Sequence, residues 1–350
     1  TMKIEANNTR CEKSLRNKNR HEGIETLLAT MWNGATQVIE DKAAIDTVGH
    51  RVVHGGTLFD RPVIISKKVK NQIRKLIPLA PLHNPANLDE IELFESLFPS
   101  LPQIAVFDTA FHLTMSEEVK TYPLPKKWRD LNIQRYGFHG ISHQYCTGRI
   151  AELFNTKKLK IVNCHLGNGC SLCAIDRGKS VATTMGFTPL EGLMMGTRSG
   201  SIDPEILIYL MQEHGISVEN LSHQLNFESG LKGIAGTSDM RTITSSHDSN
   251  SQLALKMFVF RLKAFIGEMA ASMGGLDILS FTGGIGENSG LVRKMTCEGL
   301  GFLQLKLDSR LNTSCLPDMD IARADSKTRI LVVHTEEEWL IAQECFKLLK

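Results

Sequence analysis

The chain has 350 residues, of which 42% are hydrophobic and 22% charged, and its formal net charge is +2. A charge this close to zero gives no long-range field that favours nucleic acid or a membrane surface, and no apolar stretch reaches the roughly 20 residues of a membrane span. We find no secretory signal, so we expect a cytoplasmic protein long enough for two domains.

The first part of the chain predicts one loop, three helices and two strands. Residues 5–20 are polar and without periodicity, which indicates a loop. The apolar positions of IETLLATMWNGATQVI predict a helix over about 22–40. A short strand is predicted next at TVGHRVV, and a turn follows it at HGG. Helices are then predicted at ISKKVKNQIRKLIPLA and LHNPANLDEIELFESLF. In PQIAVFDTAFH a strand is predicted that ends at Asp108.

The second part alternates strands, glycine turns and helices. A hairpin is predicted at KIVNCHLGNGCSLCAIDRGK. The next helix has Asp203 as N-cap, Pro204 at its first position and Gly215 just past its end. A long helix, apolar on several sides and therefore buried, is predicted at SQLALKMFVFRLKAFIGEMAASMGG. Strand, glycine loop and helix follow in LDILSFTGGIGENSGLVRKMTCEGL, and a last strand and helix in RILVVHTEEEWLIAQECFKLL. This alternation predicts an α/β protein.

The cysteines indicate a reducing environment rather than a metal or redox site. Cys170 and Cys173 form a lone CxxC among eight scattered cysteines. A zinc ribbon would need a second pair, and a redox CxxC normally opens a helix, whereas CSLCAI is typical of a strand. We therefore predict two buried thiols.

Two glycine-rich turns follow apolar strands. In HLGNG, Gly167 and Gly169 let a ligand approach the backbone, and the amide of Asn168 can donate to an oxygen. In TGGIGENS, Asn288 or Ser289 can cap the helix that follows. The glycines of this second turn are Gly283, Gly284 and Gly286. Neither turn is a Walker A motif, but two such turns at strand ends favour a nucleotide phosphate over ordinary turns.

Two arginines and two carboxylates stand at unusual places. Arg51 lies inside an apolar strand, and Arg198 lies among small residues in MMGTRSGS. A buried arginine needs a partner, which is either a structural carboxylate or the phosphate or carboxylate of a ligand; for Arg198 we favour the ligand. Asp108 and Glu337 follow strands, where ligands bind in α/β sheets, although a cap or a first-turn charge also explains each of them.

Four histidines lie beside turns, and three explanations compete for them. His139 and His143, four residues apart in RYGFHGISHQY, resemble the HExxH zinc helix, but Gly140 replaces its general base and no third ligand is evident. His83 and His165 stand in PLHNP and CHLGNG. Structural hydrogen bonding explains each one singly, whereas imidazole donors around a multiply charged anion explain them together.

Taken together, the motifs resemble the acetate kinases, which belong to the acetate and sugar kinase/Hsc70/actin superfamily. The resemblance runs in family order over nearly the whole chain. It is carried by VGHRVVHGG, PLAPLHNPANL, VFDTAFH, RYGFHGISH, HLGNGCSL, TTMGFTPLEGLMMGTRSGSIDP, GTSDMR, FTGGIGENS and TEEEWLIA.

The resemblance implies an α/β fold of two actin-like (ribonuclease H-like) domains, each a mixed sheet flanked by helices, with ATP in the cleft between them. The first domain would span residues 1–110, completed by the C-terminal helix 339–350, and the second residues 111–338. It also implies reversible ATP-dependent phosphorylation of acetate to acetyl phosphate, with Mg²⁺ (or Mn²⁺) as cofactor, by a homodimer.

The resemblance also assigns roles to individual residues. Arg51 and Arg198 would flank the phosphoryl group in transit, His139 would hydrogen-bond it, and Asp108 and Glu337 would organise the metal. The acyl substrate would be bound by Arg51, Val53, Leu82, His83, Phe138 and Pro189. The nucleotide would be bound by His165, Leu166, Gly167, Asn168, Gly169, Asp239, Met240, Arg241, Gly284, Ile285, Gly286 and Asn288. His143 matches a position that we expect to be structural.

The chain departs from the family pattern at its start, where an N-x-G-S-S-S-x-K phosphate loop is expected. Nothing of that kind precedes VGHRVVHGG, which corresponds to about 40 missing residues by motif alignment. We therefore expect either a fragment of the enzyme or a catalytically impaired nucleotide-binding paralogue. A propionate or butyrate kinase is a further alternative, because one or two methylenes change binding by only ~1–3 kcal/mol. The physiological direction of the reaction is not specified by these motifs.

Overall fold

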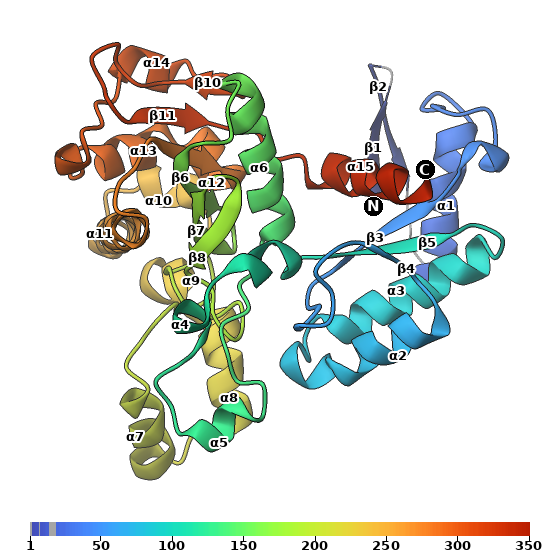
Figure 1. Cartoon of the computed structure of the whole chain (residues 1–350), viewed down its shortest axis with the longest axis horizontal. Helices are drawn as coiled ribbons and strands as arrows, with labels where there is room; N and C mark the ends of the chain where they lie inside the picture. Colours follow the sequence, from blue (N-terminus) through green and yellow to red (C-terminus); the bar gives the residue numbers. More distant parts are fainter. Residues whose placement is uncertain (1, 7, 14–18) are drawn as a thin grey trace.

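The computed structural model describes residues 2–6, 8–13 and 19–350, and its described strands form three sheets (Figure 1). A two-stranded sheet pairs β1 with β2, a three-stranded sheet has the order β3-β5-β4, and a six-stranded sheet has the order β10-β11-β9-β6-β7-β8. The strands are β1 (Met2–Ala6), β2 (Thr9–Lys13), β3 (Val48–Val52), β4 (Val63–Ile64), β5 (Gln103–Phe107), β6 (Lys160–Leu166), β7 (Cys170–Asp176), β8 (Lys179–Thr183), β9 (Ile278–Thr282), β10 (Met319–Asp320) and β11 (Arg329–Val332).

Helices cover both of the larger sheets. They are α1 (Arg20–Trp32), α2 (Lys67–Lys75), α3 (Asn84–Leu97), α4 (Glu117–Lys120), α5 (Lys126–Arg129), α6 (Gly140–Leu153), α7 (Glu205–His214), α8 (Val218–His223), α9 (Gly230–Ala235), α10 (Met240–Ser245), α11 (Ser249–Ser272), α12 (Gly283–Asn288), α13 (Gly290–Cys297), α14 (Ser309–Thr313) and α15 (Glu337–Leu349).

The three-stranded sheet is buried on both faces by helices from distant parts of the chain. Every residue of β5 is buried, and its side chains alternate between two apolar clusters. Ala105 and Phe107 pack in the cluster that α2 and α3 cover. Ile104 and Val106 pack against Leu340 of α15. The last helix of the chain therefore lies beside β3 and β5, as Figure 1 shows. The domain limits at residues 110 and 338 stay a prediction.

The six-stranded sheet has α6 on one face and the long helix α11 on the other. Within β6, Val162, Cys164 and Leu166 belong to the core cluster around α11. Ile161 packs in the cluster on the α6 face. Strands β6, β9 and β11 are parallel, whereas β7 pairs with β6 as an antiparallel hairpin. The carboxyl ends of the parallel strands therefore meet at one edge of this sheet, where ligands bind in α/β proteins.

Two predictions for the start of the chain were wrong. The predicted loop 5–20 overlaps the hairpin of β1 and β2, and its residues 7 and 14–18 lie outside the described residues. The signal was present, because MKIEA alternates apolar and charged residues with the period of a strand. The helix predicted over 22–40 ends at Trp32, since Asn33 adopts extended backbone and Gly34 a positive φ of 86°.

Two later boundaries also differ from prediction. Helix α7 begins one residue later than expected, with Pro204 at its N-cap, while Asp203 Oδ1 accepts from the Glu205 amide and Gly215 ends the helix with φ 62°. The glycine loop after β9 is itself the short helix α12. Ser289, and not Asn288, caps the helix that follows by accepting from the Val292 amide.

The cysteines are all free, and Cys170 and Cys173 are buried in strand β7, as the CxxC interpretation predicted. None of the described helices combines the length and the apolar character that crossing a lipid bilayer demands.

Candidate active site

Arg51 and Asp108 are brought together by the parallel pairing of β3 and β5. Arg51 pairs with Val106, and the Asp108 amide donates to the Val52 carbonyl at 3.0 Å just past the strand end. Arg51 Nε donates to Asp108 Oδ2 at 3.0 Å, and Nη2 donates to the same oxygen. The Asp108 side chain is 1% exposed and that of Arg51 is 43% exposed, so the guanidinium bridges a buried carboxylate and the surface of the site.

Glu337 supplies a second carboxylate to the same guanidinium. It opens α15, and its Oε2 lies 3.9 Å from Arg51 Nε. Burial raises the pKa of Glu337, and the charge of Arg51 opposes that rise. The charge of Asp108, more than that of Glu337, raises the pKa of Arg51. Arg51 thus stays charged between two carboxylates.

His139 occupies a constrained turn at the start of α6. It has left-handed backbone, φ 56° and ψ 25°, which is uncommon for a residue other than glycine. The next residue, Gly140, donates its amide to the Asp108 carbonyl at 2.9 Å. The imidazole stacks on that of His165, with ring centroids 4.3 Å apart. The fold therefore fixes His139 against both the end of β5 and the end of β6.

Arg198 meets His139 above Gly169. A methyl group placed on Gly169 would lie 3.3 Å from His139 Nε2 and 3.4 Å from Arg198 Nη1, so glycine leaves room for both side chains. Within the described part of the chain no carboxylate lies at ion-pair distance from Arg198, whose Nη1 donates only to the Pro189 carbonyl at 3.4 Å. Burial lowers the pKa of this guanidinium. A half-buried cation without a carboxylate partner favours an anionic ligand.

The histidines of the site are held neutral. Burial lowers the pKa of His139 well below its usual value, and the neighbouring His165, His143 and both arginines lower it further. The pKa of His165 is lowered to about 4, mainly by burial and to a smaller extent by the charge of Arg51. Each imidazole therefore carries one N–H at neutral pH and serves as a hydrogen-bond donor rather than as a charge.

A hollow of about 750 Å³ lies at the carboxyl ends of β6 and β9; we call it the large hollow. Its lining includes most of the predicted nucleotide-binding residues. These are Gly167, Asn168, Asp239, Met240, Arg241, Gly284, Ile285 and Asn288. Four predicted residues do not line it: His165, Leu166, Gly169 and Gly286. Ser238 and Thr244 line it and were missed, because single hydroxyl residues carry no pattern in a sequence.

One wall of the large hollow is organised by Asp239. Its Oδ1 accepts from the Arg241 amide and so caps α10. Arg241 returns a two-pronged bond through Nε and Nη2, at 3.0 and 2.7 Å, and this bond is the main cause of the fall in the pKa of Asp239 to about 2. On the opposite wall, Asn288 Nδ2 donates to the Gly284 carbonyl at 2.9 Å.

A second, apolar hollow of about 440 Å³ adjoins Arg198; we call it the apolar hollow. Three of the predicted acyl-site residues, Leu82, His83 and Pro189, line it together with Arg198. Its far wall, which the sequence analysis missed, comes from α7, α8 and the residues that follow: Leu207, Met211, Val218, Leu221 and Leu225.

Three predicted acyl-site residues do not line the apolar hollow: Phe138, Val53 and Arg51, whose guanidinium pairs with Asp108. Phe138 is 2% exposed and packs edge-on against the ring of His54, at 5.6 Å between centroids. Val53 is partly buried, and its amide donates to Asn87 Oδ1 at 3.1 Å. The direct contact of these three residues with an acyl group stays a prediction.

The two hollows flank the place where the cationic and imidazole groups meet. Asn168 lines the large hollow, Arg198 lines the apolar hollow, and Gly169 next to Asn168 lies against Arg198 and His139. An anionic group shared between ligands in the two hollows would therefore lie against Arg198 and His139.

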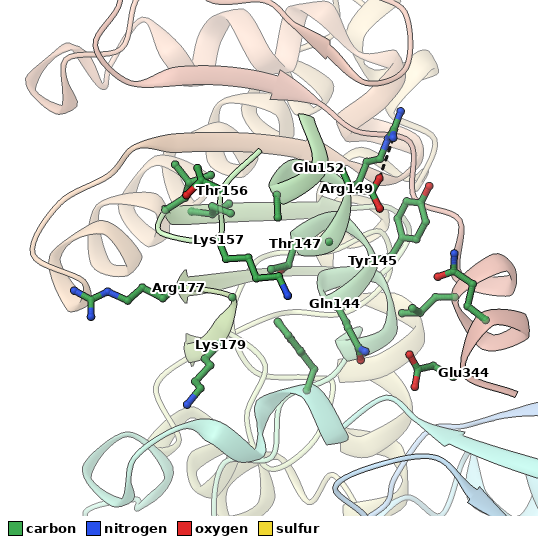
Figure 2. A pocket seen from close by; sticks show the side chains of 18 of the residues that line it. Gln144, Tyr145, Thr147, Arg149, Glu152, Thr156, Lys157, Arg177, Lys179 and Glu344 are labelled. Atoms are coloured by element: carbon green, nitrogen blue, oxygen red, sulfur yellow. Dashed lines mark hydrogen bonds and ion pairs between the residues drawn. The ribbon is translucent and has the colours of Figure 1, made fainter. Parts of the chain in front are cut away.

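A third hollow, shown in Figure 2, carries none of the predicted site residues. It has a volume of about 580 Å³ and lies on the outer side of α6, toward α15. Its lining includes long charged side chains, such as Arg149, Lys157 and Glu344, beside uncharged polar ones. Its lining includes none of Arg51, His139 and Arg198, so we do not assign the chemistry to it.

The arrangement of His139 and His143 is not that of zinc ligands. In the described ranges no three His, Cys, Asp or Glu side chains are placed to hold a metal ion together. Instead, His139 Nδ1 and His143 Nε2 both lie 2.8 Å from Ser171 Oγ. The four-residue spacing puts both rings on one face of α6, over the same serine.

Gly140→Ala should disable the site, whereas Gly148→Ala on the same helix should not. A methyl group on Gly140 would lie 2.0 Å from the Asp108 carbonyl oxygen, while one on Gly148 meets nothing within 4 Å. Displacing His139 and Asp108 by about 1 Å is expected to lower turnover on the order of 10²-fold. Gly148→Ala should keep turnover and raise the free energy of unfolding by about 0.5–1 kcal/mol. Steady-state kinetics and urea denaturation measure both, and equal turnover of the two variants would contradict the placement.

Comparison with known proteins gives consistent matches over almost the whole chain. The family model described as the acetokinase family matches residues 1–343. The acetate kinase of Protochlamydia amoebophila is 56% identical over 330 residues, which are 94% of this chain and 84% of that protein.

Solved structures match equally broadly. Porphyromonas gingivalis acetate kinase superposes with a TM-score of 0.92 at 39% identity, covering 99% of this chain and 90% of that one. A propionate kinase from Francisella tularensis gives a TM-score of 0.90 at 40% identity, covering 96% and 86%.

Proposed function

The chain belongs to the acetokinase family, and we propose from this premise that it transfers the γ-phosphoryl group of ATP to acetate, reversibly, forming acetyl phosphate. The large hollow would hold ATP, and the end of the apolar hollow nearest Arg198 would hold the acyl group. The phosphoryl group in transit would lie between them, against Arg51, His139 and Arg198.

The observation that carries this proposal is Arg198. Its guanidinium has no carboxylate partner among the described residues, is half buried, and meets His139 at the junction of the two hollows. A cation in that position is costly to leave unpaired. A phosphoryl group between two ligands supplies the missing negative charge.

The chemistry suits this set of residues. A carboxylic acid with a pKa near that of aspartic acid is already ionised at neutral pH, so the nucleophile needs no general base. The difficulty is to bring two anions together and to stabilise charge on the equatorial oxygens of the transferred group. Fixed guanidinium and imidazole donors do this without reorganising, and no nucleophilic serine or cysteine is needed.

Magnesium fits the carboxylates beside Arg51. Asp108 Oδ1 is buried and has no hydrogen-bond partner, and the Glu337 carboxylate approaches the same guanidinium. Carboxylate oxygens, completed by water and phosphate, are the ligands that Mg²⁺ prefers. Asp108 and Glu337 would hold the ion, which when bound would neutralise charge on the phosphates. Turnover of chelator-treated protein, with and without added Mg²⁺, checks this assignment.

Acetate is the preferred acyl substrate in this proposal. Two curated relatives, 56% and 52% identical, are acetate kinases, while one solved neighbour is titled a propionate kinase. Discrimination by one methylene is worth only ~1–3 kcal/mol, so activity with propionate should be lower but measurable.

The assembly and compartment implied by the family are part of the proposal. Helix α7 buries none of its residues and leaves Ile206 and Tyr209 exposed, which supports a homodimer interface at this face. Eight free cysteines support a reducing cytoplasm. Light scattering of the purified chain and cell fractionation check these two statements.

The test of the proposed function is a comparison of substrates and of binding. Purified protein with ATP, Mg²⁺ and acetate should release ADP and acetyl phosphate in equal amounts, the latter trapped as its hydroxamate. The ratio kcat/KM should fall from acetate to propionate to butyrate. Nucleotide binding by calorimetry without any turnover would instead support the catalytically impaired paralogue.

Gly284→Val should obstruct ATP while keeping the fold. A Cβ atom on Gly284 would meet nothing within 4 Å, and Gly284 lines the large hollow, so we expect the valine side chain to project into it. We expect KM for ATP to rise at least about tenfold, corresponding to about 1.4 kcal/mol. Gly267→Val in α11 is the matched control, because it also meets nothing within 4 Å and lines neither hollow. An unchanged KM for ATP in Gly284→Val would place the nucleotide elsewhere.

A further inference from the structure

A chain of buried hydrogen bonds runs away from His139 into the six-stranded sheet. His139 Nδ1 contacts Ser171 Oγ of β7 at 2.8 Å, and Ser171 Oγ contacts His143 Nε2 of α6 at 2.8 Å. His143 Nδ1 contacts Asn163 Nδ2 of β6 at 2.9 Å, and Asn163 Oδ1 accepts from Ser280 Oγ of β9 at 2.6 Å. This chain leads from the proposed phosphoryl site to the middle of the sheet.

The sheet places these residues by its register. Asn163 pairs directly with Ser280 across the parallel strands β6 and β9. His165 pairs with Ser171 across the hairpin and shares the α6 face of β6 with Asn163, two residues earlier. Four of the side chains linked by these hydrogen bonds are 0% exposed: His143, Asn163, Ser171 and Ser280. Fully buried polar residues of this kind persist only when their hydrogen bonds are complete.

Ser171 couples the protonation of the two histidines. A serine hydroxyl has one proton, so it donates to one of its two imidazole partners and accepts from the other. Consequently, one of the two nitrogens that contact Ser171 Oγ carries a proton and the other does not. The tautomer of His143 therefore sets the tautomer of His139.

The amide of Asn163 determines which group donates in each hydrogen bond of this series. With the Asn163 amide oriented as in this structure, its Oδ1 accepts from Ser280 Oγ and its Nδ2 donates to His143 Nδ1, so the proton of neutral His143 lies on Nε2. His143 then donates to Ser171, and Ser171 donates to His139 Nδ1. The proton of His139 is left on Nε2, the nitrogen that lies with Arg198 above Gly169.

We propose that Ser280, Asn163, His143 and Ser171 are positioning residues that hold neutral His139 in its Nε2–H tautomer, so that it presents a donor and not a lone pair to the transferring phosphoryl group. This inference rests on the proposed function for the identity of the anion. The opposite tautomer would turn a lone pair toward negative charge at the same position. Burial also keeps His139 and His143 neutral, so the tautomer, rather than a charge, decides whether His139 can donate.

The neighbouring histidine lacks such a device. His165 Nδ1 contacts Ser142 Oγ, which in turn contacts Thr335 Oγ1. Each of these two hydroxyl groups can donate or accept, so they do not determine whether His165 Nδ1 carries a proton. The hydrogen bonds that start at His139 instead pass through the amide of Asn163, whose Nδ2 faces His143 and donates to it. This difference makes His139 the imidazole whose donor is specified.

The test is Ser171→Ala, with Ser180→Ala as matched control. Ser180 is also a 0% exposed serine bound to a buried imidazole, His112, at 2.8 Å. The tautomer of His112 is also held by its Nε2 bond to the Phe138 carbonyl, so losing Ser180 leaves it unchanged. Ser171→Ala should lower kcat on the order of 10- to 100-fold with KM for ATP within about threefold, and Ser180→Ala should keep both. Equal kcat in the two variants overturns the proposal.

Histidine ¹⁵N NMR gives a second readout that does not depend on activity. In the wild-type protein without ligands, His139 should show a protonated Nε2 and an unprotonated Nδ1, with His139→Gln identifying its signals. In Ser171→Ala the two His139 nitrogens should move toward averaged shifts. A protonated Nδ1 in the wild type overturns the inference even if Ser171→Ala fails to fold. A wild type that shows the expected tautomer without acetate kinase turnover instead contradicts the proposed function.

Discussion

Arg198→Ala should lower kcat by about 10³-fold or more without destabilising the fold. The guanidinium supplies positive charge where charge develops in the transition state, and removing such a donor costs several kcal/mol of barrier. In the unliganded protein, however, the same group is a half-buried cation with no carboxylate partner in the described chain. Its removal relieves a desolvation cost, so the melting temperature should stay constant or rise.

Kinetics and thermal unfolding of three variants measure this effect. Arg198→Lys keeps a charge but loses the planar fork, so an intermediate kcat is expected. Arg177→Ala, an exposed arginine on the β7–β8 turn, is the control and should keep full turnover. Near-normal kcat in Arg198→Ala would remove the central cation from the mechanism. A large fall in melting temperature would instead show that Arg198 is a structural group.

Arg51→Ala should lower kcat by a similar factor but, unlike Arg198→Ala, should also destabilise the protein. Arg51 is the hydrogen-bond partner of Asp108, which is 1% exposed. Removing the arginine leaves a buried carboxylate uncompensated. A fully buried pair would cost 3–5 kcal/mol, and the exposure of Arg51 reduces our expectation to about 1–3 kcal/mol.

The double variant Arg51→Ala/Asp108→Ala separates the two effects. With both partners removed, no buried charge remains unpaired, so the free energy of unfolding should recover most of the loss. Turnover should remain as low as in the single variant, because the phosphoryl group has still lost its donor. Recovery of turnover together with stability would show that Arg51 serves only to hold Asp108.

Much of the fold follows from local patterns in the sequence. The confirmed α/β class, with two actin-like domains, was predicted from alternating strands and helices and from the resemblance. Strand β5 and helix α11 match their predicted stretches because their buried residues are continuous or densely periodic. The hairpin of β1 and β2 was missed because its alternation is short and mostly charged.

The candidate site was predictable only where chemistry leaves a visible motif. Arginines inside apolar stretches and glycines at strand ends stand out, and the structure brings Arg198, His139 and Gly169 together. Buried polar residues such as Asn163, Ser171 and Ser280 do not stand out in the sequence. Their contacts depend on strand register, which brings together residues more than one hundred positions apart. The far wall of the apolar hollow was missed for the same reason, since Leu221 and Leu225 resemble ordinary helix residues.

The central claim is that Arg51, His139 and Arg198 contact one phosphoryl group between ATP and acetate. A crystal structure with ADP, Mg²⁺, acetate and aluminium fluoride, a planar mimic of that group, tests it directly. We expect fluoride atoms within about 3.2 Å of both guanidinium groups and of His139 Nε2, with ADP in the large hollow and acetate beside Leu82 and Pro189. A fluoride group bound away from these three side chains, or an acetate site remote from Arg198, would contradict the account.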